Sequence, residues 1–186
     1  MSALVLALSG TDHHPFERMV SWLDFAAQCR PDIRFVVQHG HSSAPRIAEG
    51  HAFLPHAELV ALMRQASVVV CHGGPGTIMD ARAAGHVPLC MPRDPALGEH
   101  VDGHQQRFAA VVGEVGLVRL VPSVESMLVD IDGGVVIGPP QGTDRAADGV
   151  RTQALARAAH ELDEVAAVRP PRLIRPRRPV QPVDLP

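Results

Sequence analysis

Short apolar runs alternate along the chain with longer stretches in which apolar residues recur every three or four positions. A continuous apolar run predicts a strand buried on both faces, and the longer spacing predicts an amphipathic helix. Six strands are predicted in this way, over Ala3–Leu8, Ile33–Gln38, His51–Leu54, Ser67–Cys71, Val87–Met91 and Leu117–Val121. Helices are predicted between them, with Asp12 as N-cap of the first, over Pro15–Cys29, Ala57–Gln65, Thr77–Ala84 and about Gly103–Glu114.

Alternating strands and helices are typical of an α/β protein with a Rossmann-like, doubly wound parallel sheet. Such sheets bind their ligands at the carboxyl ends of the strands. Three polar or glycine-rich loops follow strands at that edge: Gly10–His14, Gly73–Thr77 and Arg93–His104. We therefore expect these three loops to meet in one crevice.

The pattern weakens beyond Val121. There we predict a helix over Ser123–Val129 and a short strand over Val135–Ile137. The predicted organisation is a domain over residues 1–137, a linker over 138–149, a C-terminal helix over 150–168 and a tail over 169–186. This tail is rich in Pro and Arg, and we expect it to be extended or disordered.

Composition excludes several classes of protein. Hydrophobic residues make up 46% of the 186 residues and charged residues 20%, as in globular proteins. The sequence contains no lysine, so a P-loop or Schiff-base mechanism is excluded within it. No signal-peptide pattern begins the chain and its three cysteines are scattered, which indicates a cytoplasmic protein.

Charge is unevenly distributed. The segment Val168–Pro186 has five arginines and one acid, about +4, so the total of −3 leaves about −7 for residues 1–167. Residues 1–167 are too acidic to bind the phosphate backbone of a nucleic acid well. We expect no nucleic acid among the ligands.

The most informative motif runs from Cys71 to Asp80 and contains three glycines. A strand that enters a helix through glycines leaves backbone N–H groups free for phosphate, here those of Gly76, Thr77 and Ile78. Asp80 lies one turn into the helix, where its carboxylate can accept hydrogen bonds from ribose hydroxyls. An ordinary turn with a dipole-complementing acid has the same pattern. The glycines do not follow the first strand, so a nicotinamide-dinucleotide fingerprint is disfavoured.

Histidines are concentrated in the first 104 residues. His13 and His14 follow the first strand, where imidazoles suit a general base or a phosphate partner. Neither this pair nor His39 and His41 has a third ligand at a recognised spacing, so we predict no metal site. The loop with Asp102, Gln105 and Gln106 offers donors and acceptors that fit sugar hydroxyls, although a solvated loop with a cap at Asp102 also fits.

Together these loops resemble the C-terminal, donor-binding half of GT-B glycosyltransferases, of the family 28 type. The resemblance extends over about Leu4–Val121 and rests on the order and spacing of six motifs: Leu8–Phe16, Phe53–His56, Ala66–Ser67, His72–Asp80, Ala84–Pro88 and Asp102–Phe108. It implies a single GT-B half, with the acceptor-binding half on another polypeptide.

The resemblance also assigns roles to residues. Phe53 and Leu54 would meet the uracil ring, Asp80 the ribose, and Gln105 and Gln106 the donor sugar. The full nucleotide-sugar site that it implies comprises Gly10, Thr11, Phe53, Leu54, His72, Gly74, Pro75, Gly76, Thr77, Asp80, Asp102, Gln105 and Gln106.

The implied activity is inverting transfer from a UDP-sugar, with GlcNAc or a related hexose or uronic acid as the sugar. A lipid-linked acceptor for cell-surface polysaccharide or glycolipid would be held by a membrane-anchored partner that recruits this chain to the inner face of the membrane. Loop amides, without a metal or other cofactor, would stabilise the leaving UDP. His13 and His14 are this chain's candidate bases, although we expect the base in the partner. Alternatives are a non-catalytic nucleotide-sugar-binding module and a histidine-dependent metallohydrolase.

Overall fold

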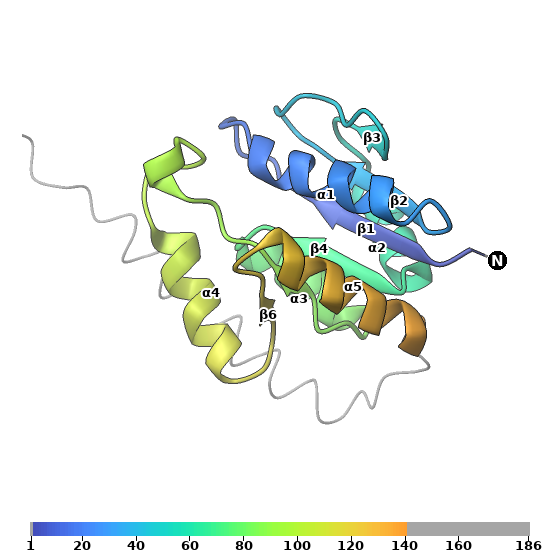
Figure 1. Cartoon of the computed structure of the whole chain (residues 1–186). Helices are drawn as coiled ribbons and strands as arrows, with labels where there is room; N and C mark the ends of the chain where they lie inside the picture. Colours follow the sequence, from blue (N-terminus) through green and yellow to red (C-terminus); the bar gives the residue numbers. More distant parts are fainter. Residues whose placement is uncertain (1, 141–186) are drawn as a thin grey trace, which may run out of the picture.

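Six parallel strands form one sheet in the computed structural model, which describes residues 2–140 (Figure 1). The strands lie in the order β3-β2-β1-β4-β5-β6. Their bounds are β1 Leu4–Leu8, β2 Arg34–Gln38, β3 Glu49–His51, β4 Val68–Cys71, β5 Leu89–Cys90 and β6 Arg119–Leu120. The helices are α1 Glu17–Cys29, α2 His56–Gln65, α3 Pro75–Ala83, α4 His104–Glu114 and α5 Val124–Ile137, with a 3-10 turn over Pro95–Leu97. The predicted Rossmann-like, doubly wound sheet is confirmed.

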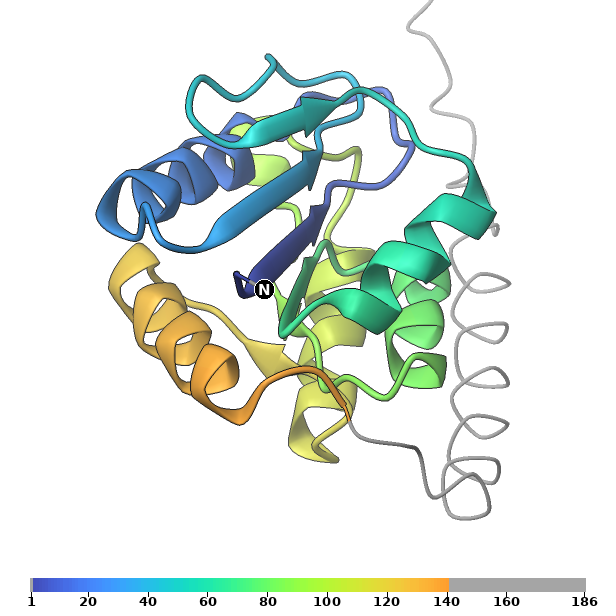
Figure 2. The same cartoon turned by 90° about the vertical axis from the view of Figure 1, so that its right-hand side faces the viewer.

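Helices cover both faces of this sheet. Figure 2 shows α1 and α5 on one side, and α2 and α3 on the other. Successive residues of β1 point alternately toward the two helical layers, because side chains alternate across a strand. Val5 and Ala7 pack with Met19 and Leu23 of α1, whereas Leu6 packs with α2. Burial on both faces explains why β1 and β4 are uninterrupted apolar runs.

The chain reverses its direction of travel across the sheet between β1 and β4. It passes outward from β1 to β3, returns to β4 beside β1, and then proceeds to β6. The loops after β1 and β4 therefore separate to opposite faces and leave a crevice at the carboxyl ends of these strands. The predicted crevice loops Gly10–His14 and Gly73–Thr77 follow these two strands.

Three local predictions are wrong. Val135–Ile137 is the last turn of α5, not a strand. The third strand is Glu49–His51 instead of His51–Leu54, so Phe53 and Leu54 lie in the loop that follows it. Asp12 does not cap α1, whose N-cap is Phe16 with no side-chain cap bond.

Other predictions fall outside the described residues. These are the C-terminal helix over 150–168, the tail over 169–186 and all but the first three residues of the predicted linker. Between residues 2 and 140, none of the helices has the length and apolar character needed to span a membrane.

Candidate functional site

Three loops are joined at the carboxyl edge of the sheet, as the sequence predicts. The buried guanidinium of Arg93, after β5, donates to the carbonyls of Ser9 and His14 after β1, at 2.8 and 2.7 Å, and to that of Glu99 at 2.9 Å. Its Cζ lies 4.8 Å from the centroid of the Phe16 ring. Arg93 therefore fixes the β1–α1 loop against the β5–α4 loop. Sequence reasoning missed this residue, because nothing in a single Arg after a strand distinguishes it from a solvated one.

His72 joins the β1–α1 loop to the β4–α3 loop. Its Nδ1 lies 3.3 Å from the Leu8 carbonyl oxygen. Burial, with a smaller contribution from the positive charge of Arg93, lowers the pKa of His72 to about 4, so the ring is neutral near pH 7. A neutral ring that donates from Nδ1 keeps a lone pair on Nε2. It can donate to a phosphate from Nε2 only after gaining a proton.

Glycines on both sides make room for this imidazole. A Cβ on Gly10 would lie 2.6 Å from His72 Cε1, and a Cβ on Gly74 would overlap His72 Nε2. Gly10 also has φ +82°, which favours glycine. Both glycines are therefore needed for packing around His72, and Gly10 is needed for the turn as well.

Gly74→Ala is expected to lower the free energy of unfolding by about 1–2 kcal/mol, because the new methyl group displaces the His72 ring. Gly76→Ala, two residues further on in the first turn of α3, is the matched control, since its Cβ would meet nothing within 4 Å. Chemical denaturation of both variants measures the difference. Equal stability of the two variants would contradict the packing role of Gly74.

The amino end of α3 presents unpaired donors. Pro75 is the first helical residue, and within residues 2–140 the N–H groups of Gly76 and Thr77 have no hydrogen-bond partner. The Ile78 N–H donates to the Gly74 carbonyl at 3.2 Å, so the prediction that it is a free donor is wrong. Two adjacent free amides at a helix start are suited to an anion.

Asp80 lies one turn further along α3 and faces the start of α2. Its Oδ2 is 3.0 Å from His56 Nε2. The β3–α2 loop that carries Phe53 and Leu54 ends at this helix start, and the Phe53 ring meets His41 edge-on at 5.3 Å. The residues predicted to hold uracil and ribose are thus brought to the same side of the crevice.

The glutamines of α4 have different environments. Gln105 is buried, and its Oε1 accepts a hydrogen bond from the Arg93 backbone N–H at 3.3 Å. A Cβ on Gly73 would lie 2.9 Å from Gln105 Cβ, so this residue packs against the β4–α3 loop. Gln106 is exposed. Contact of either with a donor sugar stays a prediction.

Histidines and aspartates of two loops form one group, which we call the histidine cluster: Asp12, His13, His14, His100, Asp102 and His104. The Asp12 carboxylate accepts from the His14 backbone N–H at 2.8 Å and lies 2.6 Å from His14 Nδ1. Burial raises the pKa of Asp12, but the two His14 hydrogen bonds and the electrostatic effects of His100 and His14 together lower it by more, so the carboxylate stays ionised. His13 is exposed and stacks on His14 at 4.0 Å between centroids.

The β5–α4 loop and the first residue of α4 supply the other half of the histidine cluster. Asp102 accepts from the His104 backbone N–H at 2.9 Å, and its Oδ1 lies 2.5 Å from His104 Nδ1. His100 stacks edge-on against His104 at 4.5 Å and lies 5.9 Å from the His14 ring. The sequence predicts that these two loops meet in one crevice, but it does not predict which of their side chains contact one another.

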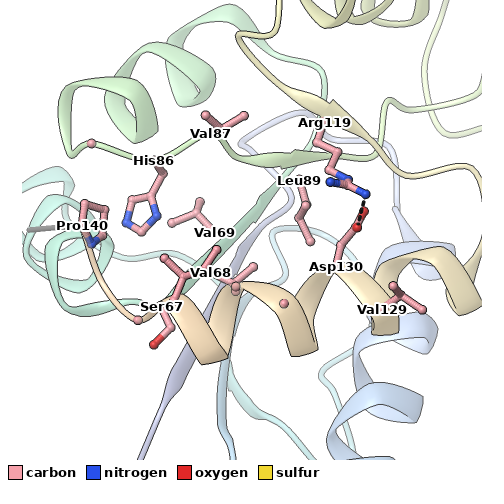
Figure 3. Close-up of a pocket in the computed structure, with 15 residues that line it drawn as sticks. Ser67, Val68, Val69, His86, Val87, Leu89, Arg119, Val129, Asp130 and Pro140 are labelled. Atoms are coloured by element: carbon pink, nitrogen blue, oxygen red, sulfur yellow. Dashed lines mark ion pairs between the residues drawn. The ribbon is translucent and has the colours of Figure 1, made fainter.

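A cavity of about 610 Å³ lies elsewhere, beneath the amino ends of β4 and β5 (Figure 3). Val68, Leu89 and the glycines of α5 line it, and Arg119 pairs with Asp130 at its edge at 2.7 Å. It contains none of the predicted site residues. The chemistry-bearing side chains gather instead at the opposite edge of the sheet.

The sequence matches the glycosyltransferase family 28 C-terminal domain over residues 18–128, more than half of the chain. The chain belongs to this family. A search of curated proteins found no match.

Two solved structures share the fold of this family 28 domain. The glycotransferase of kitacinnamycin has a TM-score of 0.56 and 20% identity, and the match covers 89% of this chain and 43% of that one. CalG4, the calicheamicin glycosyltransferase, has a TM-score of 0.52 and 20% identity, with 91% and 45% covered. This chain thus spans less than half the length of either protein, and the likeness establishes the GT-B type of fold.

Proposed function

We propose that this chain is the donor-binding, catalytic subunit of an inverting, two-component UDP-sugar glycosyltransferase. The sugar is GlcNAc or a related hexose or uronic acid. The acceptor is lipid-linked and serves cell-surface polysaccharide or glycolipid synthesis. The family 28 match and the GT-B type of fold support the reaction class.

The free amides at the start of α3 carry this proposal. The N–H groups of Gly76 and Thr77 bind the diphosphate, and Asp80, one turn further along the same helix, accepts hydrogen bonds from the ribose hydroxyls. In this arrangement the uracil ring binds at the β3–α2 loop, where it contacts Phe53 and the backbone at Leu54. Gly10 and Thr11 face the phosphates, and Gln105, Gln106 and Asp102 lie toward the sugar.

In the reaction, an acceptor hydroxyl attacks the anomeric carbon and the bond to UDP breaks on the opposite side. Negative charge grows on the diphosphate, and the α3 amides and the positive end of the helix stabilise it without a metal. The hydroxyl proton passes to a base in the acceptor-binding half. Of this chain's two candidate bases, His13 and His14, the better second proton acceptor is His14, since Asp12 orients its ring and leaves Nε2 for the proton.

The acceptor-binding half is supplied by a membrane-anchored partner polypeptide. The described residues provide one Rossmann-like sheet, whereas the crevice of a GT-B enzyme lies between two such halves. In this proposal the chain is cytoplasmic and reaches the inner face of the membrane through that partner.

Two measurements on the full chain test this function. Calorimetry with UDP, and with ADP as the matched control nucleotide, is expected to show 1:1 binding that favours UDP. The second measurement is sugar transfer from UDP-GlcNAc to a lipid-linked acceptor. We expect transfer only when this chain is combined with an acceptor-binding protein encoded beside it. UDP binding without transfer would favour a non-catalytic binding module, and absence of UDP binding would overturn the proposal.

A further inference from the structure

Arg93 carries a positive charge into the interior of the protein beside the crevice. Its side chain is 1% exposed and donates only to neutral groups, the backbone carbonyls of Ser9, His14 and Glu99. In the part of the chain that the structure describes, the guanidinium forms no ion pair with a carboxylate, and its Nε–H has no hydrogen-bond partner. The guanidinium is therefore held in place without being neutralised.

The two carboxylates that attract this charge are engaged with other groups. Glu99 pairs with Arg18, whose Nη2 lies 2.7 Å from Glu99 Oε2. Asp12 Oδ1 lies 2.6 Å from Nδ1 of His14. Burial lowers the pKa of Arg93, although the charges of Asp12 and Glu99 act in the opposite direction. An arginine stays protonated in spite of such a shift, so the buried charge persists.

This arrangement is costly for the folded protein. Removing an ion from water has a large free-energy cost, which neutral carbonyl partners offset only in part. The neighbouring Arg18 avoids this cost, because it pairs with Glu99 and stays about one quarter exposed. An anionic ligand near Arg93 would supply the negative charge that the chain itself does not.

The surroundings of Arg93 indicate where such an anion binds. Its bonds to Ser9 and His14 place the guanidinium across the base of the β1–α1 loop. After burial, which has the larger effect, the positive charge of Arg93 contributes to the low pKa of His72, whose ring abuts Gly74. Gly74 is the N-cap of α3, the helix whose first turn has the two free amides. The buried charge therefore lies behind the two loops that flank the proposed diphosphate position.

We propose that Arg93 is a positioning residue for the diphosphate of the donor. Its charge attracts the diphosphate toward the α3 amides from behind the β1–α1 loop, which it also holds in place. This role rests on the proposed function and adds to it a source of positive charge in a chain that has no lysine. The attraction increases as the bond to UDP breaks and negative charge grows on the leaving group. Arg93 itself does not contact the ligand.

The affinities of UDP and uridine, measured on the same variants, separate this charge effect from a structural one. NMR titration of the ¹⁵N-labelled full chain at pH 7.5 gives both values of Kd and shows whether each variant is folded. Arg93→Gln, whose amide can still donate to a loop carbonyl, should lower the preference for UDP over uridine about 10-fold or more, because only UDP has the diphosphate. Arg93→Lys keeps the charge and should retain most of the preference. Arg34→Gln, the matched control, removes an arginine that pairs with Glu49 at the amino end of β2 and should leave the preference unchanged.

Arg93→Lys also serves alone if Arg93→Gln does not fold. Burial lowers the pKa of a lysine, so raising the pH from 7.5 to 9 should remove its charge and reduce the preference for UDP in this variant. The wild-type preference should stay constant, because arginine does not titrate in this range and the uracil ring is common to both ligands.

Equal losses of UDP and uridine affinity in Arg93→Gln would leave Arg93 a structural role only and overturn the inference. So would a preference in Arg93→Lys that is as constant with pH as that of the wild type, where only this variant folds. The proposed function has a separate test in the wild type. If the wild type does not bind UDP, the proposed function fails together with this inference, whereas UDP binding with an unchanged preference in the variants refutes the role of Arg93 alone.

Discussion

Asp80→Ala is expected to weaken UDP binding about 10–150-fold. In the proposed function, the change removes a carboxylate that accepts hydrogen bonds from two ribose hydroxyls, and charge-assisted hydrogen bonds of this kind contribute about 1.5–3 kcal/mol. Asp80 is suited to this role because it lies one turn beyond the free N–H groups of Gly76 and Thr77. Calorimetric titration with UDP measures the loss.

Three further variants separate this role from simpler effects. Glu58→Ala removes the same charge from the first turn of the neighbouring helix α2 and should leave UDP affinity near the wild-type value. Asp80→Asn keeps the size of the side chain and should lose most of the affinity, because the amide replaces one acceptor oxygen. His56→Ala removes only the 3.0 Å partner of Asp80 and should cost less than either Asp80 variant. Unchanged affinity in Asp80→Ala would count directly against the nucleotide site.

The central strands were predictable because two-sided burial leaves a simple pattern. All five residues of β1 and all four of β4 are buried, so each reads as an apolar run. The edge strand β3 gives no such signal, since Glu49 pairs with Arg34 of β2 at 2.7 Å and the strand contains no large apolar residue. The apolar residues that suggested a strand there, Phe53 and Leu54, belong to the loop.

The end of α5 was misread for a different reason. Two glycines followed by Val135–Ile137 indicate a break and a strand by local propensity. In the fold, a Cβ on Gly134 would overlap the Val68 side chain, so this glycine allows α5 to approach β4 closely. Packing between distant segments overrides local preference at this point.

The meeting of the three loops was predictable from the alternation of strands and helices, but the contacts of individual side chains were predictable only where they are local. The β4–α3 loop and Asp80 are a continuous motif, so strand, donors and acid could be found together. The histidine cluster and the bridging role of Arg93 depend on contacts between residues about 80 positions apart, such as Arg93 with Ser9 and His14. Only the parallel order of β1, β4 and β5 brings these groups together.

The pH dependence of stability is expected to reveal the buried neutral state of His72. Burial lowers its pKa from 6.5 to about 4 in the folded protein. Between these values the unfolded chain binds a proton that the native protein does not, so the free energy of unfolding falls as the pH drops from 6.5 to 4. The difference of about 2.5 pKa units corresponds to about 3 kcal/mol.

A His72→Gln variant isolates this contribution. Its baseline stability differs from that of the wild type, but groups that both proteins share, such as Asp12 and Asp102, cancel when the two pH profiles are subtracted. Denaturation at pH 7, 6, 5 and 4 is expected to show a wild-type loss that exceeds the variant's by about 3 kcal/mol. Parallel profiles would mean that His72 has nearly the same pKa in the folded protein as in the unfolded chain. The imidazole would then accept its proton while it stays between Gly10 and Gly74. In that case, protonated His72 could donate from Nε2 to a bound diphosphate within the intact fold.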